Sequence, residues 1–149
     1  MANRDGKNGL QIVHLGNLTL SGVTPAASDW VDTKGFDKVT FIPINNTVTD
    51  AGTASGYSFE VQESDLTTAA SATAVGDTEL VGLESALTVT VDGDDNTVAG
   101  TIGYVGNARY VRVRATGTTN TAADVSIIAV LGDPSYEPPT VVGTSVAAT

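Results

Sequence analysis

The chain contains no cysteine and a single histidine, His14, in 149 residues. The absence of cysteine excludes disulfide scaffolds, cysteine-ligated zinc sites and thiol nucleophiles. A lone histidine excludes a histidine-rich metal centre, and a Ser-His-Asp triad would depend on that one residue. We therefore expect a protein that is not an enzyme and requires no cofactor.

Positive charge is also scarce, because seven Lys and Arg residues stand against 17 Asp and Glu residues, for a formal net charge of −10. Such a chain is repelled by the phosphates of nucleic acid and by an anionic membrane surface. No stretch approaches the roughly 18 apolar residues of a membrane span, and the N-terminal residues lack the apolar run of a signal peptide. We expect a soluble product, made in the cytoplasm, that binds neither nucleic acid nor membrane directly.

What the sequence does contain is short runs in which apolar and polar residues alternate, the pattern of half-buried antiparallel strands. Turn-forming residues separate the runs, and we expect turns at pairs such as Gly16-Asn17 and Asn45-Asn46. The predicted strands are Leu10–Leu20, Lys38–Ile44, Tyr57–Glu63, Leu87–Val91, Val98–Val105, Arg109–Ala115 and Val125–Leu131, with weaker candidates at Asp29–Asp32 and Glu79–Leu83.

This pattern predicts an all-β protein, an antiparallel β-sandwich of jelly-roll-like form, because only a second sheet can cover the apolar face of each strand. We expect a flexible N-terminal arm over residues 1–9, the sandwich over 10–131 and an extended C-terminal tail over 132–149. The segment Ser64–Ala74 should form at most a short helical turn. The residues expected to point inward are Val39, Phe41, Phe59, Val61, Leu87, Val89, Val111, Val113, Ile127 and Ala129.

Two acidic groups were considered as chemical sites. Asp92, Asp94 and Asn96 alternate as oxygen ligands do in calcium loops, but Thr97 stands where such a loop needs glycine and Gly103 where it needs glutamate. We therefore favour an acidic turn over a calcium site. Glu60 and Glu63 fall on opposite faces of one strand and so cannot flank a glycosidic bond as a catalytic pair.

The remaining candidates are contact residues. Arg109, Arg112 and Arg114 lie on one strand, and the pattern places Arg112 and Arg114 on its wet face, suited either to cross-strand pairing with acidic residues or to a subunit contact. The tail suggests either a frayed terminus or an arm lying on a neighbouring subunit, stiffened by prolines and anchored by valines. Its candidate contact residues are Tyr136, Pro138, Pro139, Val141 and Val142, with Val146 as a further small anchor.

Four segments, in order, resemble a group of small proteins encoded among the head genes of tailed bacteriophages. The segments are VDTKGFDKVTF at Val31–Phe41, YSFEVQESD at Tyr57–Asp65, IGYVGNARYVRV at Ile102–Val113 and IAVLGDP at Ile128–Pro134. The family's usual histidine-containing ending after the last segment is replaced here by Ser135–Pro139.

This resemblance implies a virion structural protein that decorates the exterior of the capsid and stabilises it, with the major capsid protein of a tailed phage as partner. It also implies many copies on the shell or a homo-oligomer, and it carries over no catalytic residue. The alternative is a phage head fibre or carbohydrate-binding module that attaches virions to surface glycans. For this carbohydrate-binding alternative, the aromatic residues that could stack on sugar rings are Trp30, Tyr57, Tyr104, Tyr110 and Tyr136.

Overall fold

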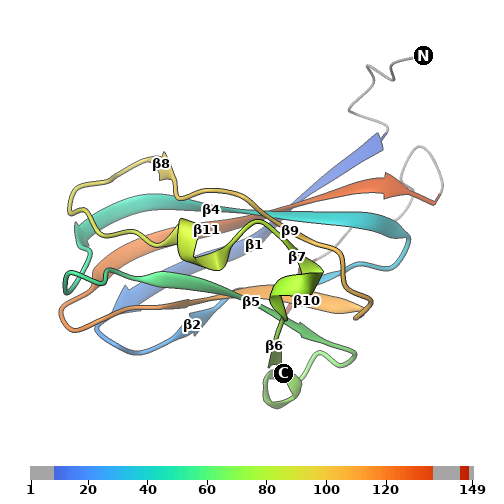
Figure 1. The fold of residues 1–149 in the computed structure, drawn as a ribbon, viewed down its shortest axis with the longest axis horizontal. Coiled ribbons are helices and arrows are strands. Elements are labelled where there is room, and N and C mark those ends of the chain that lie inside the picture. Colours follow the sequence, from blue (N-terminus) through green and yellow to red (C-terminus); the bar gives the residue numbers. More distant parts are fainter. Residues whose placement is uncertain (1–8, 136–144, 148–149) are drawn as a thin grey trace.

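A computed structural model describes residues 9–135 and 145–147 of the chain (Figure 1). The strands are β1 (Leu10–Ser21), β2 (Ala26–Ala27), β3 (Trp30–Asp32), β4 (Phe36–Asp50), β5 (Ser58–Ser64), β6 (Thr73–Ala74), β7 (Leu80–Val81), β8 (Thr97–Val98), β9 (Ile102–Tyr104), β10 (Tyr110–Thr116), β11 (Ala122–Pro134) and β12 (Ser145–Val146). Three short 3-10 turns accompany them, η1 (Ala69–Ser71), η2 (Asp77–Glu79) and η3 (Glu84–Leu87).

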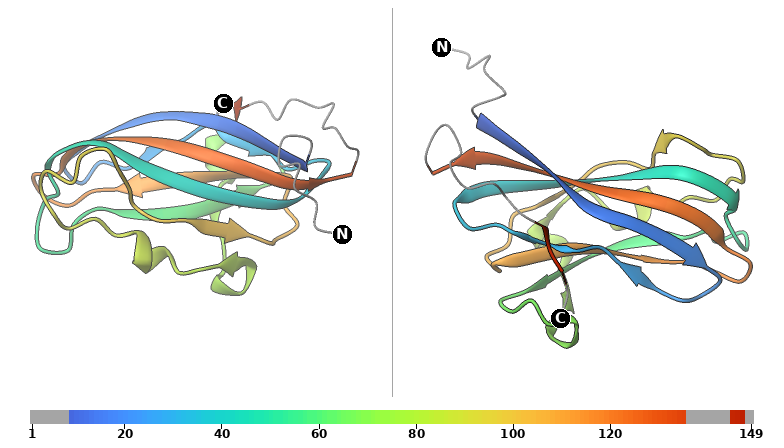
Figure 2. Two further views of the ribbon diagram at one scale, coloured as in Figure 1. Left: turned by 90° about the horizontal axis from the view of Figure 1, so that it is seen from above. Right: turned by 180° about the vertical axis from the view of Figure 1, so that it is seen from behind.

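The strands form two antiparallel sheets packed face to face as two layers (Figure 2). Sheet A has the order β1-β11-β4-β9-β7, and β8 pairs with β4 beside this path. Sheet B has the order β12-β3-β10-β5-β6, and β2 pairs with β10. The expected β-sandwich is therefore confirmed.

The core lies between the sheets and is built by the alternation along each strand. On β10, Val111 and Val113 are fully buried, and on β11 the same holds for Ile127 and Ala129. Tyr57 and Phe59 add an edge-to-face aromatic pair with ring centroids 5.8 Å apart. All ten residues expected to point inward are buried, which confirms the predicted inward faces of β4, β5, β10 and β11. Leu87 and Val89 are buried although they do not lie in a strand.

Two predicted turns are wrong, because both lie inside long strands. Gly16 has a positive φ of 106°, and the β1–β11 register shifts between His14 and Asn17, so this pair forms a bulge within β1. Asn45 is buried within β4, where its side chain accepts the Tyr57 hydroxyl at 2.7 Å and donates to Thr97 Oγ1 at 3.0 Å. A buried asparagine with both partners in place does not need the solvent that a turn would give it.

Other strand boundaries also differ from the sequence-based expectation. The predicted strand Val98–Val105 is divided into β8 and β9. Leu87–Val91 is not a strand: Leu87 closes η3, and Val89 makes an isolated bridge to Tyr57. Strand β11 continues past Leu131 to Pro134, which pairs with Phe36. The Ser64–Ala74 segment contains only the turn η1 and β6, in line with the expected short helical turn.

Within the described residues, no helix is long and apolar enough to cross a membrane.

Candidate functional site

The four segments that carry the bacteriophage resemblance meet at one end of the sandwich, here called the motif end. Its first part is the turn from β3 to β4. Asp32 accepts the Lys34 amide at 3.0 Å, Gly35 takes a positive φ of 88°, and the Phe36 amide donates to the Thr33 carbonyl at 3.0 Å. The acidic residue and the glycine of this segment are thus what its tight turn requires.

The start of β10 is tied directly to this turn. The Arg109 guanidinium donates hydrogen bonds to the Asp32 carboxylate, with Nη2 at 2.9 Å from Oδ2 and Nε at 3.3 Å from each carboxylate oxygen. The Thr33 amide donates to the Arg109 carbonyl at 2.8 Å. Burial alone would raise the pKa of Asp32, but the Arg109 guanidinium and the Lys34 amide outweigh it and hold the pKa below its usual value.

Tyr104, at the end of β9, connects the segment Ile102–Val113 to the segment Tyr57–Asp65. Its hydroxyl donates to Glu63 at 2.5 Å and accepts the Ala108 amide at 2.9 Å. Burial, reinforced by the Glu63 carboxylate, raises the pKa of Tyr104, so the phenol keeps its proton and remains a donor. A Cβ on Gly106 would lie 2.4 Å from this hydroxyl, so the position admits no side chain while the tyrosine is held there.

The last segment closes the motif end. Lys38 forms an ion pair with Asp133, and the Ser135 amide donates to the Gly35 carbonyl at 2.8 Å. Leu10, the first residue of β1, is the register partner of Gly132 close by. Strand β1 therefore begins, and strand β11 ends, at the motif end (Figure 1).

The three arginine side chains of the predicted strand Arg109–Ala115 lie in three different environments. Arg109 pairs with Asp32 and lies 5.0 Å over the Tyr110 ring, while Arg114 lies 3.7 Å from Glu60 on the neighbouring strand. The Arg114–Glu60 contact is the kind of cross-strand acidic pairing that one of the two interpretations predicted for Arg112 and Arg114.

Arg112 departs from the expectation of a wet face, because it is only 6% exposed. Its guanidinium lies 4.4 Å over the Trp30 ring, and Nε donates to Gln62 Oε1 at 3.0 Å. Burial, together with the neighbouring charge of Arg114, lowers the pKa of Arg112. The side chain therefore stabilises the outer surface of sheet B as packing, and its burial makes it a poor direct contact for a partner.

The aromatic residues offer little for stacking on sugar rings. Trp30, Tyr57 and Tyr104 are buried, and the Trp30 ring nitrogen donates to the Thr67 carbonyl at 3.0 Å. Tyr110 is half-buried, and Tyr136 lies outside the described residues.

The acidic turn at Asp92, Asp94 and Asn96 has a structural explanation. Asp92 accepts the Ala51 amide at 2.8 Å, and Asp95 accepts the Val48 amide at 2.6 Å, so both carboxylates cap the end of β4. Asn96 takes a positive φ of 56°, as asparagine in a turn often does. Among the described residues, no group of three or more His, Cys, Asp or Glu side chains is placed to hold a metal ion.

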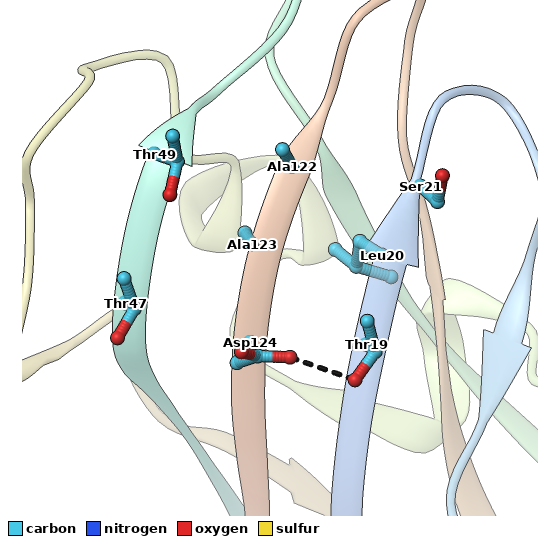
Figure 3. Close-up of a pocket in the computed structure, with 8 residues that line it drawn as sticks. All are labelled: Thr19, Leu20, Ser21, Thr47, Thr49, Ala122, Ala123 and Asp124. Carbon is cyan, nitrogen blue, oxygen red and sulfur yellow. Dashed lines mark hydrogen bonds between the residues drawn. The ribbon is translucent and has the colours of Figure 1, made fainter.

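A shallow hollow of about 280 Å³ lies at the far end of sheet A, between β1, β11 and β4 (Figure 3). Its walls are mostly hydroxyls and small side chains, and its one carboxylate, Asp124, accepts the Thr19 hydroxyl at 2.7 Å. His14 is exposed elsewhere on β1, beside Asn17. The hollow therefore contains one hydroxyl–carboxylate pair and no histidine.

The tail candidates Tyr136, Pro138, Pro139, Val141 and Val142 lie outside the described residues. Val146 is described: it is half-buried in β12 and pairs with Trp30 of the same chain.

One surface was missed by the sequence interpretation, namely the outward face of sheet A. Its signal was present in the continuous apolar runs FIPI in β4 and IIAVL in β11, because a strand apolar on both faces predicts that both faces are covered. Ile42, Ile128 and Val130 of these runs point outward and are only half-buried.

No family model matches the chain, and no curated protein matches it. Among solved structures, the chain is similar to a protein from work on the disulfide-linked pili of Bacillus endospore appendages. The two are 16% identical over 90% of this chain and 96% of that chain, with a TM-score of 0.41. A likeness at this level carries no argument about function.

Proposed function

We propose that this protein is a virion structural protein that binds the outside of a tailed-bacteriophage capsid and stabilises the shell. Its partner is the major capsid protein, and many copies decorate each head. A protein that binds the assembled shell and not the free subunits stabilises the shell by mass action. That role needs a firm scaffold and adhesive segments, and it needs no active site.

The observation that carries the proposal is the convergence at the motif end. Segments from four separate parts of the sequence, which together resemble phage head proteins, interlock there through the Asp32–Arg109, Glu63–Tyr104 and Lys38–Asp133 contacts. Strand β1 begins and strand β11 ends at this end. The network thus supplies a rigid base from which extended arms could reach the shell.

We propose that the capsid contacts come from extended arms, through Tyr136, Pro138, Pro139, Val141 and Val142, with Arg109 at the motif end and Arg114 further along β10. The side chains of Arg109 and Arg114 are 50% and 38% exposed, so they can exchange or share their acidic partners. Arg112 serves as packing beneath them. The net charge of −10 favours the outer surface of a head over its DNA-filled interior.

The test is co-sedimentation of the purified chain with DNA-filled heads that lack it, taken from the phage whose genome encodes it. We expect saturable binding by the full chain, and at least tenfold weaker binding by a chain lacking residues 140–149. Its melting temperature should fall only slightly, because, among the described elements, the deletion removes just the two-residue strand β12 from the edge of sheet B. The control is Val23→Lys, an exposed residue of the β1–β2 loop. Absence of saturable binding by the full chain would contradict the proposed function. Unweakened binding by the truncated chain would contradict the role of the C-terminal arm.

A further inference from the structure

The outward face of sheet A is apolar across five of its strands. Here it is called the outer apolar face, and it borders the motif end at the Lys38–Asp133 pair. Ile12, at 70% exposure, is its most accessible large side chain. Its members are Leu10, Ile12, Ile42, Ile44, Val81, Val98, Val105, Ile128 and Val130.

The same face is nearly free of charge in a strongly acidic protein. Lys38 and Asp133 form an ion pair at one end, and Asp124 bonds to Thr19 at the other. Between these ends, the outward residues of β1, β11 and β4 carry no carboxylate or cation apart from the His14 imidazole. Two copies of this chain can therefore approach face to face here without opposing carboxylates.

The shape of the face is self-complementary. One cross-strand row runs from Ile12 on β1 through Val130 and Thr40 to Gly103 on β9. Ile12 projects at one end of this row. At the other end the absent side chain of Gly103 leaves a hollow of about 390 Å³, whose walls include Thr40, Val81 and Val105.

We propose that this face binds a second copy of the chain about a twofold axis that runs parallel to the strands, between β11 and β4. Such an axis exchanges β1 with β9 and β11 with β4, so Ile12 of each copy enters the hollow over Gly103 of the other. The same operation brings Leu10 against Val105, and Ile128 against Ile42, in the row next to Ile12 on either side.

Charge and size agree with this arrangement. The operation places Lys38 of one copy over Gly132 of the other, beside Asp133, so the two acid–base pairs at that edge can be shared between copies. Four strands roughly 4.8 Å apart and about 30 Å of strand length give a footprint of roughly 600 Å² per copy. The total, on the order of 1,200 Å², reaches the range of specific interfaces.

The first test is the mass of the full chain in solution, measured by sedimentation velocity over a concentration series. We expect a reversible dimer that Ile12→Lys weakens at least tenfold, because the substitution places a charge in an apolar hollow. The matched control, Val23→Lys, replaces a residue of similar exposure, 64%, away from the face and should leave the dimer intact. A monomer at every concentration up to about 0.5 mM, or an unweakened dimer in Ile12→Lys, would overturn the proposal.

The second test fixes the register and uses the absence of natural cysteine. Ile12→Cys and Val81→Cys lie three strand spacings or more apart in one copy, too far to bridge within it. Because packed sheets stand about 10 Å apart, beyond the Cα separation of a disulfide, the probe is a short bismaleimide that joins two thiols. An equal mixture of the two variants should give the mixed dimer, whereas Ile12→Cys alone should give little. Equal cross-linking by Ile12→Cys alone would contradict this axis. If the chain is monomeric and Ile12→Lys lowers binding to heads, the shell and not a second copy occupies the face.

Discussion

At the scale of single residues, the stability of the sandwich depends on buried polar side chains that each have a specific partner. Asn45 and Tyr57 satisfy each other inside the core, and Arg112 rests on Trp30 beneath the surface of sheet B. Each of these groups is costly to leave unpaired once buried. Substitutions that remove or add one buried charge should therefore have the largest effects.

Val113→Asp should lower the free energy of unfolding by about 3–5 kcal/mol, because Val113 is fully buried and the new carboxylate would have no partner. Chemical denaturation followed by circular dichroism measures this change. Val23→Asp, at an exposed position, should change it by less than about 0.5 kcal/mol. Equal stability of the two variants would mean that the inward face of β10 has been assigned wrongly.

The Asp32–Arg109 pair should contribute to the pH dependence of stability. Because the pKa of Asp32 is lower in the folded protein than the usual value near 3.9, its contribution is fully present above that value. The contribution is lost as the pH falls through the lower, folded pKa. Unfolding free energies of wild type and Asp32→Asn, measured between about pH 6 and pH 2, should converge toward the acid end. A constant difference across that range would contradict the assignment.

At the scale of strands and turns, alternation alone predicted the position of β1, β4, β5, β10 and β11. It did so because each of these strands has one face against the core. The wrong predictions of turns and strands have a common physical cause. Contacts with residues distant in the sequence determined the local structure. Asn45-Asn46 has the composition of a turn, but Tyr57 and Thr97, from other parts of the chain, hold Asn45 within a strand.

The candidate site was predicted only in part for the same reason. Cross-strand pairing of Arg114 with an acidic residue could be anticipated from the sequence. The burial of Arg112 could not, because nothing in the local pattern places Trp30, from β3, against the same face of β10. The convergence of four distant segments at the motif end likewise depends on the strand order of both sheets.

Gly106→Ala tests the packing of the motif end. The added methyl would lie 2.4 Å from a Tyr104 hydroxyl that Glu63 and Ala108 hold in place, so we expect a loss of about 2 kcal/mol. Gly76→Ala is the matched control, because its Cβ would meet nothing closer than 3.9 Å. Thermal denaturation of both variants measures the difference. A neutral Gly106→Ala would show that the tyrosine is free to move.

The acidic turn after Val91 should not depend on a cation. Asp92 and Asp95 are occupied with backbone amides of β4, so chelator or added calcium should shift the melting temperature by less than about 1 °C. Asp95→Ala should cost about 1–3 kcal/mol, because the Val48 amide loses its acceptor. A calcium-dependent rise of several degrees would restore the calcium loop as the better interpretation.

At the scale of the whole molecule, the protein has one interlocked end, where β1 begins and β11 ends, and one apolar, nearly uncharged face. These two features meet at the Lys38–Asp133 pair and support different contacts. The motif end suits attachment to a shell through extended arms, whereas the outer apolar face suits pairing of two copies. A dimer would double the number of arms and so strengthen attachment without any new contact to the shell.

The central claim is that the chain resides on the outside of a phage head, and the most direct measurement is electron cryomicroscopy of heads from the phage that encodes it. Heads from wild-type phage and from a deletion of this gene should be compared, with protein composition measured by mass spectrometry. The account predicts the chain in wild-type heads, with sandwich-sized density outside the shell that the deletion removes. Heads without the chain, or identical density in the two samples, would contradict the account.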